Sequence, residues 1–369
     1  MKKCVLILLA LMMLSDVGCV FAEDADIYGL PNKSSHLTDG LLVAEVSKMA
    51  QITGEDSANK TQSRFNVWGT DLGSMTEMEG IVYMFCGDTF STKDSDDWRS
   101  NVLFLIEDDD PSNGLTITGT IEDKWGRSKE LLISRKIDNI QITIIPTNIF
   151  AIGDTLYCVY MSVKHWLPQG GMWECGYSGL AKSEDKGQTW QKLNNVQWQG
   201  DSNFCQTANC LVGDTMYIWG IPSGRYGGVA LMKVPVDGLE DFEAYSYYTG
   251  NDENGKPVWV KGSEGIYRAK AIINAPVGEI SVIYNEYLGN FIMTYLHEGR
   301  GIVMREGVMP WGEWGGEVML ASGTKYASLY GGFMCDKYVE NDGQTFYFAM
   351  SQFFPIYNIM WMKAELTIE

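Results

Sequence analysis

The sequence predicts an all-β protein, a five-bladed β-propeller that forms a single domain after a cleaved signal peptide. Three observations support this prediction: a hairpin pattern that recurs five times, an apolar segment after each hairpin, and a turn motif at residues 183–190. Repeated units of three or four antiparallel strands are the sequence signature of propeller blades.

The hairpins are recognised by their turns. In the first copy, two apolar segments flank Glu79-Gly80, a pair suited to the two-residue turns that join antiparallel strands. The turns of the other copies are Gly153-Asp154, Gly213-Asp214, a position near Gly289, and Asp342-Gly343.

A third apolar strand is predicted after each hairpin. The five segments are residues 101–106, 177–182, 227–234, 301–305 and 358–363. Residues 41–52 are expected to supply an outer strand that closes the ring against the last blade.

The turn motif is Ser183-x-Asp185-x-Gly187-x-Thr-Trp190, the Asp-box pattern of sialidases and other propellers. Asp185 can accept hydrogen bonds from backbone amides, Gly187 can adopt a positive φ, and Trp190 can pack inward. We interpret this motif as structural.

The N-terminus has the features of an export signal. Lys2 and Lys3 precede an apolar stretch at residues 5–14, and Val20-Phe21-Ala22 fits a cleavage site before Glu23. We therefore predict a signal peptide at 1–22, a linker at 23–40 and the catalytic propeller domain at 41–369. Gly18-Cys19 offers an alternative, a lipid anchor at Cys19, although Asp16 stands where a lipobox has an aliphatic residue.

No later segment approaches the roughly 20 apolar residues of a membrane span. The predicted location is the periplasm or the extracellular space, with an outer-membrane lipoprotein as the alternative.

Composition narrows the choice of partner. The chain of 369 residues is 45% hydrophobic, enough for a large core, and carries a net charge of −19. Such a charge opposes nucleic-acid binding through bulk electrostatics and suits an uncharged sugar substrate. No cysteine or histidine spacing matches a metal site, so we expect no metal and no cofactor.

Asp71 and Asp88 are the candidate catalytic residues. In a hairpin with a two-residue turn at Glu79-Gly80, the residue numbers of two paired positions sum to 159. Asp71 would therefore face Asp88, with Cβ atoms about 5 Å apart. Neighbouring carboxylates repel, but glycosidic cleavage needs such a pair, as an acid and as a nucleophile or base. A solvated pair at the strand ends, or a pair held by Arg99, are the structural alternatives.

In a propeller, the first strand of each hairpin begins and the second ends at the same face, which collects the candidate substrate-binding residues. Aromatic rings can stack on sugar rings while polar groups reach hydroxyls. Glu279 is a third carboxylate, and Arg99 is expected to pair with one aspartate. The full set is Trp98, Arg99, Thr147, Ser162, His165, Trp166, Gln206, Arg225, Glu279, Tyr330 and Gln352.

Several motifs, in order, resemble a known family. They are Gly69-Thr70-Asp71-Leu72-Gly73, Phe85-Cys86-Gly87-Asp88-Thr89-Phe90, Trp98-Arg99-Ser100-Asn101, Gly278-Glu279-Ile280-Ser281 and Tyr330-Gly331-Gly332-Phe333. The family was formerly of unknown function and includes endo-D-arabinanases, which cut the D-arabinofuranose polymer of mycobacterial-type cell walls. The resemblance implies a five-bladed propeller with a paired-aspartate site at Asp71 and Asp88.

Together these features predict an exported glycoside hydrolase that cleaves a furanoside polysaccharide, with endo-cleavage of D-arabinan as the specific candidate. A non-catalytic carbohydrate-binding propeller is the first alternative. A sialidase-like hydrolase is the second, and it is disfavoured by the single Asp box and by the lack of an Arg-Ile-Pro segment near the N-terminus.

Overall fold

A computed structural model describes residues 27, 29–94 and 96–369, so the predicted signal peptide and Cys19 lie outside the described residues. The described chain is an all-β fold in which helices are short. Its strands and its α-helix, in order, are β1 (Leu41–Gln51), α2 (Thr61–Phe65), β2 (Leu72–Met78), β3 (Ile81–Cys86), β4 (Thr89–Phe90), β5 (Trp98–Arg99), β6 (Val102–Ile106), β7 (Ile117–Thr120), β8 (Thr143–Ile152), β9 (Thr155–Trp166), β10 (Trp173–Ser183), β11 (Gln191–Gln199), β12 (Gln206–Val212), β13 (Thr215–Ile221), β14 (Gly227–Pro235), β15 (Ser246–Asn251), β16 (Pro257–Lys261), β17 (Ile273–Asn285), β18 (Asn290–His297), β19 (Gly301–Gly307), β20 (Val318–Ser322), β21 (Leu329–Glu340), β22 (Thr345–Gln352) and β23 (Asn358–Ile368).

All predicted hairpins are present. The antiparallel pairs are β2–β3, β8–β9, β12–β13, β17–β18 and β21–β22. The predicted third strands are also present, as β6, β10, β14, β19 and β23, each paired with the second strand of its hairpin.

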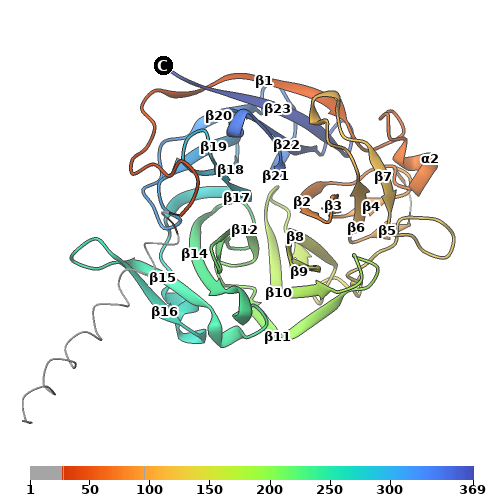
Figure 1. Ribbon diagram of the computed structural model, residues 1–369. Coiled ribbons are helices and arrows are strands. Elements are labelled where there is room, and N and C mark those ends of the chain that lie inside the picture. The colour runs from red at the N-terminus through yellow and green to blue at the C-terminus, as the bar shows by residue number, and fades with distance from the viewer. Residues whose placement is uncertain (1–26, 28, 95) are drawn as a thin grey trace, which may run out of the picture.

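The first strands of the hairpins form the centre of the molecule (Figure 1). β2, β8, β12, β17 and β21 contact one another in that cyclic order, and β21 returns to β2. The remaining strands of each sheet extend outward, as in a propeller. Because β14 also pairs with β17, the third and fourth hairpins share one nine-stranded sheet, and the number of blades stays a prediction.

The ring is closed by a strand from the beginning of the domain, as predicted. β1 pairs with β23, which pairs on its other side with β22 (Figure 1). The Thr53 hydroxyl, just beyond β1, donates a 2.8 Å hydrogen bond to Asn358 Oδ1 at the start of β23.

The described part of the predicted linker packs on the β17–β19 sheet. Tyr284 donates a 2.6 Å hydrogen bond to the Pro31 carbonyl, and the Thr38 hydroxyl donates one of 2.8 Å to Glu306. Ile27 is buried in the same apolar cluster as strands β17 and β18. These residues therefore form an ordered strap.

The register of the first hairpin differs from the prediction at one place. Met78 pairs with Ile81 around a turn in which Glu79 and Gly80 have positive φ, as predicted. A bulge at Gly73 then shifts the register, so that the Asp71 carbonyl accepts a 3.0 Å hydrogen bond from the Gly87 amide. Asp71 is consequently not directly opposite Asp88, although both lie at the same end of the hairpin.

The turn between β10 and β11 has the hydrogen bonds expected of the motif at 183–190. Asp185 accepts from the Ser183 hydroxyl at 2.8 Å and from the Thr189 amide and hydroxyl at 2.9 and 2.6 Å. Gly187 has φ 85°, and the Trp190 ring packs 5.1 Å from Phe85 of β3. The turn therefore ties the β8–β11 sheet to the neighbouring β2–β7 sheet.

None of the helices among the described residues is both long and apolar enough to cross a membrane. The six cysteines in this part of the chain, Cys86, Cys158, Cys175, Cys205, Cys210 and Cys335, are free thiols.

Replacing Asp185 with alanine should destabilise the protein by about 1 kcal/mol, because the hydrogen bonds within the turn are lost. A fall of roughly 2 °C in the melting temperature is expected for a chain of this size, measured by differential scanning calorimetry. Asp154→Ala, at an exposed position of the β8–β9 turn, is the control and should leave the melting temperature unchanged. Equal losses in both variants would contradict a structural role for Asp185.

Candidate active site

Bulges shape the end of the ring where the site lies. Register shifts occur in β2 at Gly73, in β8 at Thr147, in β17 at Glu279 and in β21 between Tyr330 and Phe333. Each shift turns the adjoining residues relative to the rest of the strand. Strands from four sheets are thus reshaped at the same face of the molecule.

Asp71 is half-buried at the start of β2, beside a strained backbone. Leu72 has φ 63°, which is rare for a bulky side chain, and its amide donates a 2.8 Å hydrogen bond to the Ser351 hydroxyl. Gly87 is required here, because a Cβ at that position would collide with Asp71 Oδ1.

Tyr330 donates a 2.8 Å hydrogen bond to Asp71 Oδ2, whereas the buried Oδ1 has no hydrogen-bond partner among the described residues. Burial, and next the charge of Asp88, raise the pKa of Asp71 to about 7, while the phenols of Tyr357 and Tyr330 oppose the increase. Asp71 therefore holds a proton close to neutral pH.

Asp88 lies in a more polar environment. Its Oδ1 accepts hydrogen bonds from Trp98 Nε1 at 2.7 Å and from the Thr143 hydroxyl at 2.6 Å. Burial raises the pKa of Asp88 to about 6, against the lowering effect of Thr143, Trp98 and the Lys136 cation. The pair thus contains one carboxyl surrounded by phenols and carboxylates, and one whose ionised form is stabilised by donors.

Glu279 and Arg225 form a buried ion pair beside Asp71. Glu279 Oε1 accepts from Arg225 Nε and Nη2, both at 2.8 Å, and the charge of Glu279 is a further cause of the raised pKa of Asp71. Arg225 also lies 4.8 Å from the centre of the Tyr330 ring. Glu279 Oε2 and Trp173 Nε1 are buried without hydrogen-bond partners in the described chain, so each could bond a hydroxyl group of a ligand.

A series of aromatic contacts leads from Asp88 to the surface. Trp98 stacks on Phe90 with 6.3 Å between ring centroids, Phe90 contacts Tyr357 at 5.8 Å, and Tyr357 contacts Phe353 at 6.2 Å. Phe353, between β22 and β23, is 69% exposed. This series lies over the sheets that contain β2 and β21.

A second series leads away from Asp71. Beyond Tyr330, Arg225 lies 6.0 Å from the Trp173 ring, which contacts Trp166 at 5.6 Å. Trp166 is 39% exposed at the end of β9. The second series therefore lies over the sheets of β8 and β12, on a different side of the ring from the first.

The structure brings five of the predicted substrate-binding residues to the pair or to these series of contacts. They are Trp98, Trp166, Arg225, Glu279 and Tyr330.

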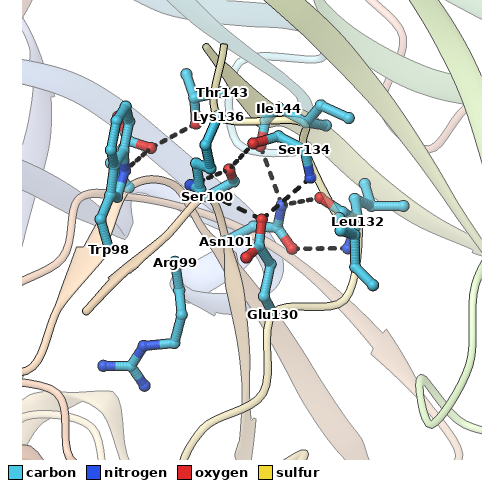
Figure 2. A network of polar contacts seen from close by, with 12 residues as sticks. Trp98, Arg99, Ser100, Asn101, Glu130, Leu132, Ser134, Lys136, Thr143 and Ile144 are labelled. Atoms are coloured by element: carbon cyan, nitrogen blue, oxygen red, sulfur yellow. Dashed lines mark hydrogen bonds and ion pairs between the residues drawn. The ribbon is translucent and has the colours of Figure 1, made fainter. Parts of the chain in front are cut away.

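Arg99 does not pair with either aspartate. Its guanidinium donates hydrogen bonds to the carbonyls of Ser128 at 2.8 Å and Asn66 at 2.5 Å, and it lies 3.8 Å from Asp97. Figure 2 shows it pointing away from Trp98. The physical reason is that neighbouring residues of a strand, here β5, face opposite sides.

The remaining predicted binding residues bond to the protein itself. Thr147 is the bulged residue of β8 and donates to the Val159 carbonyl, Ser162 accepts from Gln141, and Gln206 donates to the Gly224 carbonyl. Gln352 donates to the Ala327 carbonyl, and His165 Nδ1 lies 2.6 Å from Asp138.

Four residues of the site were not predicted from the sequence: Thr143, Tyr357, Lys136 and Trp173. Thr143 is the first residue of β8 and lies at the strand end, whereas Thr147, which the sequence predicts at this position, lies inside the strand. Trp173 is the first residue of β10. Lys136 and Tyr357 belong to connections between strands, and no local motif marks them.

A cavity of about 570 Å³ lies among the central strands and is lined by residues such as Ser74, Asn148, Asn209, Ser281 and Asp336. Within the described residues, no group of three or more histidine, cysteine or acidic side chains is placed to hold a metal ion.

A family model described as a domain of unknown function, DUF4185, matches residues 56–363. No curated protein matches the chain by sequence.

Solved structures share the fold. A Bacteroides ovatus protein described as a candidate hydrolase is similar over 82% of this chain and 87% of its own, at 11% identity and a TM-score of 0.57. The exo-β-1,3-galactanase of Phanerochaete chrysosporium, bound to β-1,3-galactotriose, is similar over 88% of this chain and 64% of its own, at 8% identity and a TM-score of 0.51. At these identities the similarity shows a common fold.

Replacing Asp71 with asparagine should raise the melting temperature at pH 8 by several degrees and change it little at pH 4. Because the pKa of Asp71 is about 7 in the folded protein and about 3.9 in an unfolded chain, stability is lost progressively as the pH rises from the unfolded to the folded pKa, and the loss is complete above the folded one. Asparagine carries no charge, so the variant avoids this loss.

The measurement is a thermal-shift series from pH 4 to pH 8. Asp56→Asn, at an exposed surface position, is the control and should show no pH-dependent gain. An Asp71→Asn variant whose melting temperature differs from wild type by the same amount at every pH would contradict the raised pKa.

Proposed function

Because the chain belongs to the DUF4185 family and has the fold of propeller-type hydrolases, we propose that it is a glycoside hydrolase in which Asp71 is the general acid and Asp88 the base or nucleophile. The observation that carries this proposal is the asymmetric carboxylate pair. Asp71, with a pKa of about 7, holds a proton to give to a leaving oxygen, whereas Asp88, hydrogen-bonded by Trp98 and Thr143, is the more readily ionised member.

The proposed substrate is a furanoside polysaccharide, with D-arabinan as the first candidate from the resemblance noted above. Two features of the site support a long sugar chain. Aromatic contacts lead away from the pair on two sides of the ring, toward the exposed Phe353 and Trp166, so sugar units could stack on either side of the cleaved bond. This arrangement favours endo-cleavage.

The other parts of the proposal are export of the protein and a propeller of five blades. The cyclic contacts of β2, β8, β12, β17 and β21 support the blade count. A sialidase-like reaction is less consistent with the site, because Arg225 is engaged by Glu279 and Arg99 by backbone carbonyls.

The Asp88→Asn and Asp71→Asn variants should each lower kcat on the cognate polysaccharide by about 10²- to 10⁴-fold while the protein remains folded. The assay is release of reducing ends from a panel of plant and bacterial glycans that includes D-arabinan. Asp94→Asn, on an exposed loop, is the matched control.

A non-catalytic carbohydrate-binding protein would give a different result. It would retain a glycan from the panel in affinity electrophoresis without releasing product, and both aspartate variants would retain that glycan as well as wild type does. This outcome would overturn the proposed hydrolase.

The roles of the two aspartates can be separated with aryl furanosides. A phenol that is a good leaving group does not need protonation, so Asp71→Asn should cleave such a substrate at close to the wild-type rate of glycosidic bond breaking. Asp88→Asn should be impaired on aryl furanosides and on the polysaccharide alike. If the two variants behave the other way round, the assignment of acid and base must be exchanged.

A further inference from the structure

A lysine outside the predicted site lies beside Trp98, the hydrogen-bond donor to Asp88 (Figure 2). Lys136 Nζ is 4.1 Å from the centre of the Trp98 ring, and the Trp98 indole donates to Asp88. The same ammonium group donates a 2.6 Å hydrogen bond to the Ser100 hydroxyl and lies 3.8 Å from Glu130. Its side chain is 28% exposed, so its charge is only partly screened by water.

We propose that Lys136 is a positioning residue that keeps Asp88 in its ionised form and fixes the Trp98 ring against it. The proposal rests on the proposed function, since it explains why Asp88 and not Asp71 is the base or nucleophile. A cation near a carboxylate favours the charged form, and a cation over an indole ring limits the movement of that ring.

The backbone of Lys136 is held in place by its surroundings. Lys136 has φ 55°, in the left-handed region that a lysine seldom adopts. On one side of it, the Ile137 amide donates to the Gln141 carbonyl at 3.1 Å and the Ile137 carbonyl accepts from the Gln141 amide at 2.8 Å. On the other side, the Arg135 amide donates to Gln141 Oε1 at 3.2 Å. The lysine therefore belongs to a hydrogen-bonded turn between β7 and β8.

The polar groups that contact the Lys136 ammonium group are themselves held by hydrogen bonds. The Ser100 hydroxyl donates to Ser134 Oγ at 3.0 Å, and the Ser134 amide donates to Glu130 Oε1 at 3.2 Å. Figure 2 shows these groups gathered around the ammonium group. Ser100 and Glu130 thus orient Lys136 from the side away from Trp98.

The charged groups near the two aspartates are distributed unequally. Lys136 lowers the pKa of Asp88, and Glu130 opposes it, although Glu130 is itself engaged with Lys136. The charges acting on Asp71 are those of Asp88 and Glu279, which both raise its pKa. The nearby Arg225 is bound to Glu279, which leaves Lys136 as the cation that distinguishes the two carboxyls.

The test is the pH dependence of kcat/KM in Lys136→Met and Lys136→Arg. Methionine removes the charge and has a side chain of similar length. The acidic limb of the kcat/KM profile should therefore move to higher pH by about one unit as the pKa of Asp88 rises. Arginine keeps the charge and should restore the wild-type limb. A loss of kcat/KM by the same factor at every pH in Lys136→Met would overturn the proposal, because it would indicate a structural role alone.

Lys192→Met is the matched control. Lys192 also lies over an aromatic ring, 5.6 Å from the centre of Tyr160, and donates to the Ile133 carbonyl at 2.9 Å. It is not among the charges that act on either aspartate. Its substitution should leave the position of the acidic limb unchanged, and an equal shift in Lys192→Met would count against the specific role of Lys136.

A second measurement separates this proposal from the proposed function. Carboxyl ¹³C NMR of the aspartate-labelled protein, with the Asp88 signal assigned from its loss in Asp88→Asn, reports the protonation of Asp88 without any substrate. Its titration midpoint should rise by about one unit in Lys136→Met and stay in place in Lys136→Arg. An unchanged midpoint in Lys136→Met overturns the proposal, whereas a shifted midpoint in a protein that cuts no glycan overturns only the proposed function.

Discussion

The packing of the first strands around one axis is the constraint on which the rest of the structure depends. β2, β8, β12, β17 and β21 come from widely separated parts of the chain, and their contacts in a ring bring their ends to one place. Tyr330 and Asp71, which are 259 positions apart in the sequence, are hydrogen-bonded there. Any site at this end can therefore combine carboxyl, phenol and guanidinium groups from several sheets, and the strand–strand contacts below hold those groups in position.

Within this frame, the bulges decide which side chains face the axis. A regular strand would point alternate residues at the centre, but the shifts at Gly73, Thr147 and Glu279 change that alternation within each strand. The bulge at Glu279 accompanies its buried ion pair with Arg225, and the bulge at Gly73 lies next to the strained Leu72. Irregular backbone thus coincides with the buried acidic groups, which is expected where structure is shaped by function and not by stability.

The sequence was informative wherever the signal was local. Turn pairs such as Glu79-Gly80 predicted the hairpins, the apolar segments after them predicted the third strands, and residues 41–52 were predicted separately as the closing strand β1. Counting outward from a turn failed for β2, where the bulge at Gly73 places Asp71 beside Gly87 and not opposite Asp88, and the extent of β8 places Thr143, not Thr147, at the strand end. Arg99 was expected to pair with one aspartate, although strand alternation points it away from Trp98 and the pair. Lys136 and Tyr357 reach the aspartates only through tertiary packing, which no spacing in the sequence reveals.

The place of β23 between β22 and β1 has a consequence for synthesis. β1 leaves the ribosome early but finds its partner only when β23 has emerged, and the hydrogen bond that accompanies this pairing joins residues 305 positions apart. Until then β1 and β22 each present an unpaired edge, the kind of edge that invites pairing with other chains. The nascent chain therefore cannot complete its fold before β23 has been synthesised. Until then, the edges of β1 and β22 have to be shielded from other chains.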